Sequence, residues 1–183
     1  MNVFERLLYA KRIAAHETGH VLLAWFSSYV REVAWVSLEK SKTAYFSLPR
    51  GSSEFLFDRA VICLAGIAGE AAVFGRFRSG PAAGDLLTAR ACAEEYRRTP
   101  DCARRLGRIK PPGAPMTLDF AAMFSDRPPP EVCRVLDCAY AAARDKIISF
   151  RDAFDRVRQM LLDKKELKRD EIAALFGPRP WAP

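Results

Sequence analysis

The sequence predicts a mainly α-helical domain with a small two- or three-stranded β-sheet. Apolar residues recur at helical spacing over residues 4–26, residues 55–74 are apolar on nearly every face, and a 3.6-residue pattern runs from 132 to 161. Only residues 33–48 show the β-branched and aromatic enrichment that is typical of strands. A length of 183 residues fits one domain.

The N-terminal half is expected to hold a helix, a strand pair and a second helix. No proline interrupts the first helix, residues 4–26. Two strands, residues 33–38 and 44–48, are separated by the polar turn EKSKT. The second helix, residues 55–74, has Gly75 in the position that C-terminal caps prefer. Its apolar character places it in the core.

The C-terminal half is expected to be helical on both sides of a loop. After the loop RFRSGPAAG, a third helix runs from Asp85 to about residue 97, with the Asp85 carboxylate as a candidate cap. The pattern over 132–161 predicts one long helix or two end to end, and RDEIAALFG predicts a last helical turn. We therefore expect a single domain, residues 1–183, in three parts: 1–98, a Pro- and Arg-rich loop with room for one short helical turn at 99–130, and C-terminal helices at 131–177.

Composition excludes several classes of protein. With 50% hydrophobic and 28% charged residues the chain can bury a core, which excludes wholesale disorder. The net charge is +7, but the arginines of residues 97–110 lack interleaved aromatic residues and a known motif, so nucleic-acid binding is not expected. The longest apolar run, 60–74, contains Glu70 and is shorter than the roughly 20 residues of a spanning helix, so no transmembrane segment is expected. Five cysteines without a CxxC pair, and an N-terminus without a signal-peptide core, indicate a reducing compartment, the cytoplasm.

The motif HExxH lies inside the first helix, as His16-Glu17-Thr18-Gly19-His20. Residues four apart on a helix face the same way, so the two imidazoles can bind one zinc ion while Glu17 serves as general base on a water molecule. These are the only two histidines of the chain. Gly19 costs about 1 kcal/mol relative to Ala inside a helix, which favours a close approach of another backbone there. The plainer interpretation is a pair of ordinary histidines with Glu17 as a solvated charge.

A catalytic zinc ion takes three protein ligands and keeps one position open. No other histidine is present and no cysteine pair offers itself, so a carboxylate is expected, with Asp85 and Glu70 as the leading candidates. Each has an ordinary alternative role, Asp85 as a helix cap and Glu70 as a paired charge between helices. Spacing alone does not choose between the two.

Four stretches are similar to the peptidase domain of the FtsH-type ATP-dependent zinc metalloproteases, and they occur in that family's order. They are RIAAHETGHVLLA (12–24), LAGIAGEAAVFG (64–75), SGPAAGDLLTARACA (79–93) and VLDCAYAAARDKI (135–147). The resemblance implies that His16, His20 and Asp85 bind one Zn²⁺ per chain, with Glu17 as catalytic base. It also implies that Glu70 lies in the helix behind the metal, where it can accept a hydrogen bond from a ligand histidine.

The resemblance further implies a zinc metalloendopeptidase that acts on unfolded or extended polypeptides. The strand Ala44–Ser47, with Tyr45 and Phe46, resembles the family's edge strand beside the zinc, to which a substrate can add. The sequence contains no GxxxxGK[ST] loop, so we expect a stand-alone peptidase domain that lacks the AAA ATPase module and the membrane anchor. Expected partners are the polypeptide substrate, and either a homo-oligomer or a separate AAA ATPase. The alternative is a non-catalytic peptidase-like module for polypeptide binding or assembly.

Overall fold

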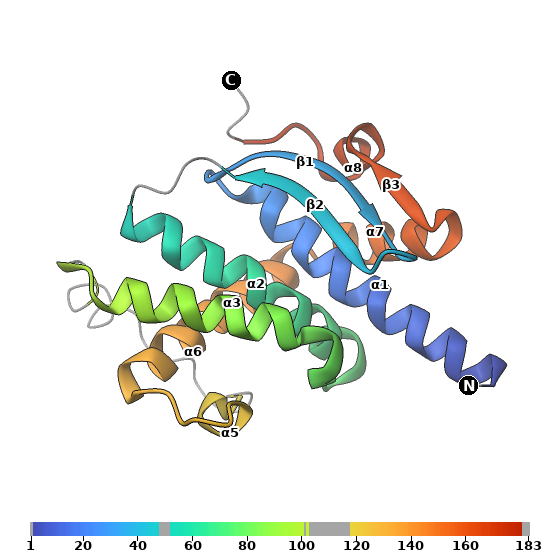
Figure 1. Ribbon diagram of the computed structural model, residues 1–183. Coiled ribbons are helices and arrows are strands. Elements are labelled where there is room, and N and C mark those ends of the chain that lie inside the picture. The colour runs from blue at the N-terminus through green and yellow to red at the C-terminus, as the bar shows by residue number, and fades with distance from the viewer. Residues whose placement is uncertain (1, 48–51, 101, 103–117, 181–183) are drawn as a thin grey trace.

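A computed structural model describes residues 2–47, 52–100, 102 and 118–180, without the side chains of residues 79–81. The expected mainly α-helical architecture with a small sheet is confirmed (Figure 1). Helix α2 (Ser53–Phe74) lies at the centre and packs against α1 (Val3–Phe26), α3 (Ser79–Arg97) and α6 (Pro130–Ser149). The apolar character of α2 follows from this position, because neighbours cover it on several faces.

Two glycines allow α1 and α2 to cross with their backbones in contact. A Cβ atom at Gly19 would lie 2.1 Å from the backbone oxygen of Ala65, and one at Gly69 would lie 2.3 Å from that of Ala15. Real Cβ atoms do not approach an oxygen so closely. The close approach expected at Gly19 is therefore present, and it brings the HExxH segment against the middle of α2.

The sheet is antiparallel, with strand order β2-β1-β3. Strands β1 (Val30–Ser37) and β2 (Lys42–Ser47) form the expected pair, and β2 is an edge strand in contact with α1. The third strand, β3 (Glu166–Lys168), comes from the C-terminal part of the chain and pairs with β1. Only Leu167 of its three residues is buried, so its short pattern carries little signal in the sequence.

Helix α3 begins at Ser79, so the expected loop at residues 76–84 is too long and the helix start expected near Asp85 is wrong. The expected loop contains Pro81, but proline is tolerated in the first turn of a helix, where N–H groups have no intrahelical acceptor. The residue before the helix is Arg78, which makes no side-chain cap. Asp85 lies in the second turn, so capping does not account for it.

The C-terminal segment consists of two helices end to end, α6 and α7 (Arg151–Lys164), separated at Phe150, followed by α8 (Arg169–Phe176). The part of the expected loop 99–130 that the structure describes contains the short helix α5 (Phe120–Met123), and Pro100 and Cys102 are also helical. Within the described ranges, no helix combines the length and the apolar character needed to cross a membrane.

Candidate metal centre

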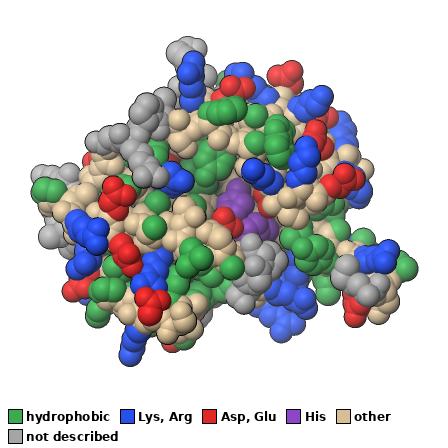
Figure 2. Space-filling model, in the orientation of Figure 1, with side chains coloured by type: hydrophobic (Ala, Val, Ile, Leu, Met, Phe, Trp, Pro, Cys, Tyr) green, Lys and Arg blue, Asp and Glu red, His purple; other side chains and the backbone are tan. Residues whose placement is uncertain are grey.

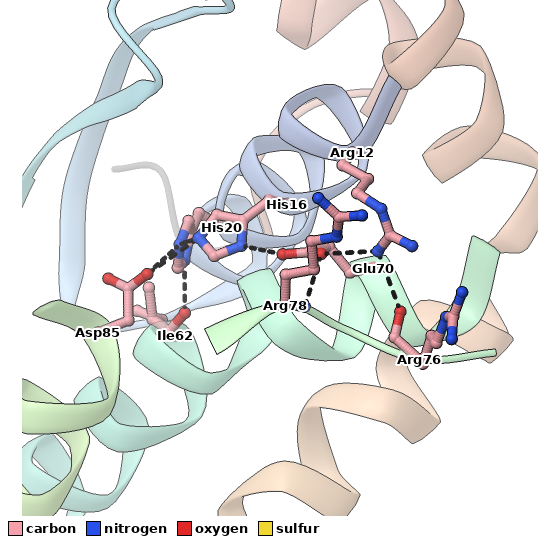
Figure 3. Close-up of polar contacts among 8 residues, drawn as sticks. All are labelled: Arg12, His16, His20, Ile62, Glu70, Arg76, Arg78 and Asp85. Carbon is pink, nitrogen blue, oxygen red and sulfur yellow. Dashed lines mark hydrogen bonds and ion pairs between the residues drawn. The ribbon is translucent and has the colours of Figure 1, made fainter. Parts of the chain in front are cut away.

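Helices α1 and α3 bring three potential metal ligands together at one point. The Nε2 atoms of His16 and His20 lie 3.1 Å apart, and the Asp85 Oδ2 atom lies 2.9 Å from the first and 3.2 Å from the second (Figure 3). The histidines belong to consecutive turns of α1, and Asp85 reaches them from the second turn of α3. Among the described residues this is the one cluster of three such groups.

Hydrogen bonds behind the two rings fix which nitrogen faces the cluster. His20 Nδ1 lies 2.8 Å from the backbone oxygen of Ile62, which can only accept, so Nδ1 carries the proton of the neutral ring. His16 Nδ1 likewise lies 3.0 Å from the Glu70 Oε1 atom. When both rings are neutral, their Nε2 atoms therefore turn a lone pair toward the Asp85 carboxylate oxygen.

This donor set fits zinc. Tetrahedral ligands at bond lengths of about 2.0–2.2 Å lie about 3.3–3.6 Å from one another, a few tenths of an ångström more than the 2.9–3.2 Å separations in this cluster. Three lone pairs that converge without a shared proton repel each other unless a cation lies between them.

The pKa values of the ligands also indicate a site that favours a cation. Burial lowers the pKa of His16, but the hydrogen-bonded carboxylates of Asp85 and Glu70 outweigh burial and raise that pKa from 6.5 to about 9. Burial raises the pKa of Asp85, but both histidines outweigh it and hold the pKa below its usual value. The site thus favours a positive charge.

Gly66 of α2 leaves the space that the imidazoles occupy. A Cβ atom there would lie 2.5 Å from the Nε2 atom of His16 and 2.7 Å from that of His20. Because both contacts are to the metal-facing nitrogens, any larger residue would displace the proposed ligands themselves.

Glu17 lies beside the cluster, only 4% exposed, and its Oε2 atom accepts a hydrogen bond of 2.9 Å from the Thr43 hydroxyl. Both residues line a pocket of about 290 Å³ together with the three candidate ligands. The histidines are visible from outside at the centre of this face (Figure 2), so the pocket is open to solvent. A carboxylate at this place can take a proton from a water molecule next to a metal ion.

Of the expected edge-strand residues, one lines the same pocket. Tyr45 lines it, whereas Phe46 is 61% exposed. Ala44 is partly buried and Ser47 is exposed. Burial raises the pKa of Tyr45 well above its usual value, so this phenol stays neutral and acts as a hydrogen-bonding or apolar wall.

Glu70 lies behind the cluster, 1% exposed, and contacts the far nitrogen of His16. Of the two carboxylates considered as third ligand, the structure places Asp85 at the cluster and Glu70 away from it. Two partners were not singled out from the sequence, Thr43 beside Glu17 and Arg12 beside Glu70. Arg12 carried a signal, because it lies one helical turn before His16 on the same face. Thr43 carried none.

Comparison with known proteins finds a family that matches most of the chain. The profile of Peptidase family M41 matches residues 8–175. The mitochondrial inner membrane m-AAA protease component yta12 of Schizosaccharomyces pombe is 26% identical over 93% of this chain and 23% of its own length. The ATP-dependent zinc metalloprotease FtsH of Corynebacterium glutamicum is 28% identical over 91% of this chain and 22% of its own length. The ATP-dependent zinc metalloprotease FtsH 1 of Salinibacter ruber is 29% identical over 92% of this chain and 26% of its own length. The chain thus spans about a quarter of the length of these relatives.

Proposed function

The chain belongs to peptidase family M41, and from this premise we propose that it is a zinc metalloendopeptidase that hydrolyses peptide bonds of unfolded or extended polypeptides. The observation that supports this most strongly is the convergence of His16 Nε2, His20 Nε2 and Asp85 Oδ2, with the Glu17 carboxylate beside them. The two bacterial relatives add support, since both are ATP-dependent zinc metalloproteases.

In this proposal His16, His20 and Asp85 hold one Zn²⁺ ion. Zinc with three protein ligands lowers the pKa of a water molecule to about 7 and polarises the carbonyl group of the scissile bond. Glu17 takes the proton of the attacking water on its carboxylate and delivers it to the nitrogen of the leaving amine. Thr43 orients that carboxylate through its hydrogen bond to Oε2.

Strand β2 offers the place where substrate binds. As an edge strand it has backbone groups that no other strand among the described residues uses. An extended segment that adds to the Ala44–Ser47 stretch would lie along the pocket that Glu17 and the ligands line. Recognition through main-chain hydrogen bonds selects unfolded chains over folded ones and depends little on the identity of the substrate's side chains.

Partners and location are part of the same proposal. Because the relatives named as ATP-dependent proteases are about four times longer, we assign the unfolding of folded substrates to an ATPase that acts with this domain, with self-association as the other partner arrangement. We assign the protein to the cytoplasm, because five cysteines without a CxxC pair are typical of a reducing compartment.

The test is cleavage of an unfolded casein-like protein by zinc-loaded material without ATP. The native chain is compared with Glu17→Gln, which keeps the shape of the side chain and leaves the three ligands intact. Cleavage by the native chain alone supports the proposal. If neither protein cleaves while both hold zinc, the addition of a family ATPase separates a dependent peptidase from a non-catalytic module for polypeptide binding or assembly. The absence of bound zinc in the native chain contradicts the proposal.

A further inference from the structure

Arg12 is a buried cation directly behind the three proposed ligands. Its side chain is 7% exposed, and its Nη1 atom lies 3.3 Å from Glu70 Oε2 (Figure 3). The other oxygen of Glu70 lies 3.0 Å from His16 Nδ1. Arg12, Glu70 and His16 therefore form an unbroken series of contacts that ends at the metal-facing Nε2 atom.

The carboxylate of Glu70 is held from behind by two donors. Its Oε2 atom accepts from Arg12 Nη1 and, at 3.2 Å, from the backbone N–H of Arg78. This leaves Oε1 for His16. Because Arg12 and His16 lie four residues apart on α1 and Glu70 lies on α2, the carboxylate bridges two consecutive turns of α1.

Core packing does not account for this arrangement. Burial of a charged pair is costly, and replacement of such a pair by apolar residues of similar volume is often neutral or stabilising. Apart from Glu70, the guanidinium of Arg12 has few interaction partners among the described residues. It lies 4.5 Å from the centre of the Phe74 ring and 3.4 Å from the backbone oxygen of Arg76, and its Nε atom has no hydrogen-bond partner among the described residues.

We propose that Arg12 is a positioning residue of the zinc site, which neutralises and orients Glu70 so that His16 keeps its proton on Nδ1 and turns Nε2 toward the metal. This inference rests on the proposed zinc site, but not on peptidase activity. It makes the two histidines unequal. His20 is held by a neutral partner, the Ile62 carbonyl, whereas His16 is held by a carboxylate with its own counter-ion. Partners of this kind behind a ligand histidine commonly change metal affinity by about 10–100-fold.

The experiment measures zinc affinity by chelator competition, and the visible spectrum of the cobalt(II)-loaded protein, in four proteins besides the native chain. Arg12→Met removes the charge and keeps an aliphatic stem. Arg12→Lys keeps the charge, with a single ammonium group. Glu70→Gln removes the carboxylate, and the double variant Arg12→Met/Glu70→Gln leaves no unpaired buried charge. Thermal unfolding without metal reports the fold of each.

Arg12→Met is expected to bind zinc about 10–100-fold more weakly than the native chain and to shift the cobalt spectrum, with Arg12→Lys in between. Since Arg12 acts through Glu70, the double variant is expected to bind no more weakly than Glu70→Gln. If Arg12→Met does not fold, two measurements decide the question. One is the loss of zinc affinity in Arg12→Lys, and the other is the comparison of zinc affinity between Glu70→Gln and the double variant.

Three results would each overturn the inference. The first is native zinc affinity in Arg12→Met, and the second is native zinc affinity in Arg12→Lys if Arg12→Met does not fold. The third is a double variant in which the separate affinity losses of Arg12→Met and Glu70→Gln multiply. Zinc binding without cleavage by the native chain would count against the proposed function alone. An absence of zinc binding in the native chain would overturn both.

Discussion

The hydroxyl of Thr43 donates a hydrogen bond to Glu17 Oε2 across 2.9 Å. It also lies 3.2 Å from the backbone oxygen of Glu17, and its single proton can serve only one of these acceptors at a time. This contact ties the edge strand β2 to the turn of α1 that carries the proposed base. The orientation of that base therefore depends on the strand along which we expect substrate to bind.

Replacement of Thr43 by valine is expected to slow cleavage without loss of zinc. Valine keeps the branched shape and the strand preference of threonine but lacks the hydroxyl. A hydrogen bond to a charged group contributes about 1.5–3 kcal/mol, so kcat should fall roughly tenfold or more while KM changes little. Thr43→Ser keeps the hydroxyl and should retain most of the native kcat. A Ser variant as slow as the Val variant, or a Val variant as fast as the native chain, contradicts this role.

Substitution of glycine by alanine at three positions should separate effects on the stability of the fold from effects on zinc affinity. Gly66→Ala places a methyl group against the ends of two imidazoles, which can swing away, so we expect a folded protein with zinc affinity reduced more than about 100-fold, beyond the loss typical of groups that only support ligands. Gly19→Ala meets the Ala65 backbone, which cannot yield, and should lower the melting temperature strongly. Gly84→Ala meets nothing within 4 Å and should change neither.

Zinc content and circular-dichroism melting curves of the three proteins give the readout. If Gly66→Ala binds zinc as the native chain does, His16 and His20 do not bind metal in the arrangement described here.

Local patterns predicted the helices well, because each has an apolar face or an apolar interior. Residues 4–26 were expected for a helix that spans Val3–Phe26, and 55–74 for one that spans Ser53–Phe74. The start of α3 was not predicted because its first turn contains Pro81, a residue typical of loops that the first turn of a helix also accepts. A third strand was allowed for, but the location of β3 was not predicted, because this strand depends on pairing with β1 and three residues show no periodic pattern.

Some residues of the candidate site could likewise be predicted from local sequence spacing, and others could not. His16, Glu17 and His20 lie in one helical motif, so their spacing alone placed them together. Asp85 and Glu70 come from other helices, and the sequence spacing left both open as the third ligand. Thr43 and Arg12 act through contacts made by tertiary packing alone, at separations of 26 and 58 residues from Glu17 and Glu70.

Loss of the Asp85 carboxylate should remove most of the zinc affinity. Asp85→Asn keeps the size of the side chain but replaces the charged oxygen that contacts both histidines with a neutral amide. We expect a loss of more than about 100-fold, since removal of groups that merely support ligands already costs about 10–100-fold. Glu95→Gln, an exposed carboxylate on the same helix, is the control and should bind zinc as the native chain does. Equal affinity of the Asn variant in chelator competition would exclude Asp85 as a ligand.

Proline in the edge strand should reduce peptide cleavage. Phe46→Pro removes a backbone N–H from β2, and we expect cleavage of unfolded substrate to fall at least about tenfold while zinc content is unchanged. Phe46→Ala removes the exposed ring but keeps the N–H, so it should cleave nearly as the native chain does.

A change on the substrate side tests the same strand without any effect on the protein's stability. Peptides with backbone N-methyl groups near the scissile bond should be cleaved more slowly than unmodified ones by the native chain. Equal rates with these peptides and full activity of Phe46→Pro would contradict strand addition.

The carboxyl group of Asp58 should make the fold less stable as the pH rises above about 4. Burial raises the pKa of Asp58 above its ordinary value of 3.8, and the hydrogen bond that Ser27 donates to Oδ2 only partly offsets this. The unfolded chain therefore loses this proton at a lower pH than the folded chain, which favours unfolding once the pH passes 3.8 and until the folded group has also ionised. Asp58→Asn can still accept from Ser27 but does not ionise. Urea unfolding of both proteins between pH 4 and pH 7 should show the Asn variant gaining stability relative to the native chain as the pH rises, and a constant difference across that range would mean that Asp58 is not desolvated in the folded protein.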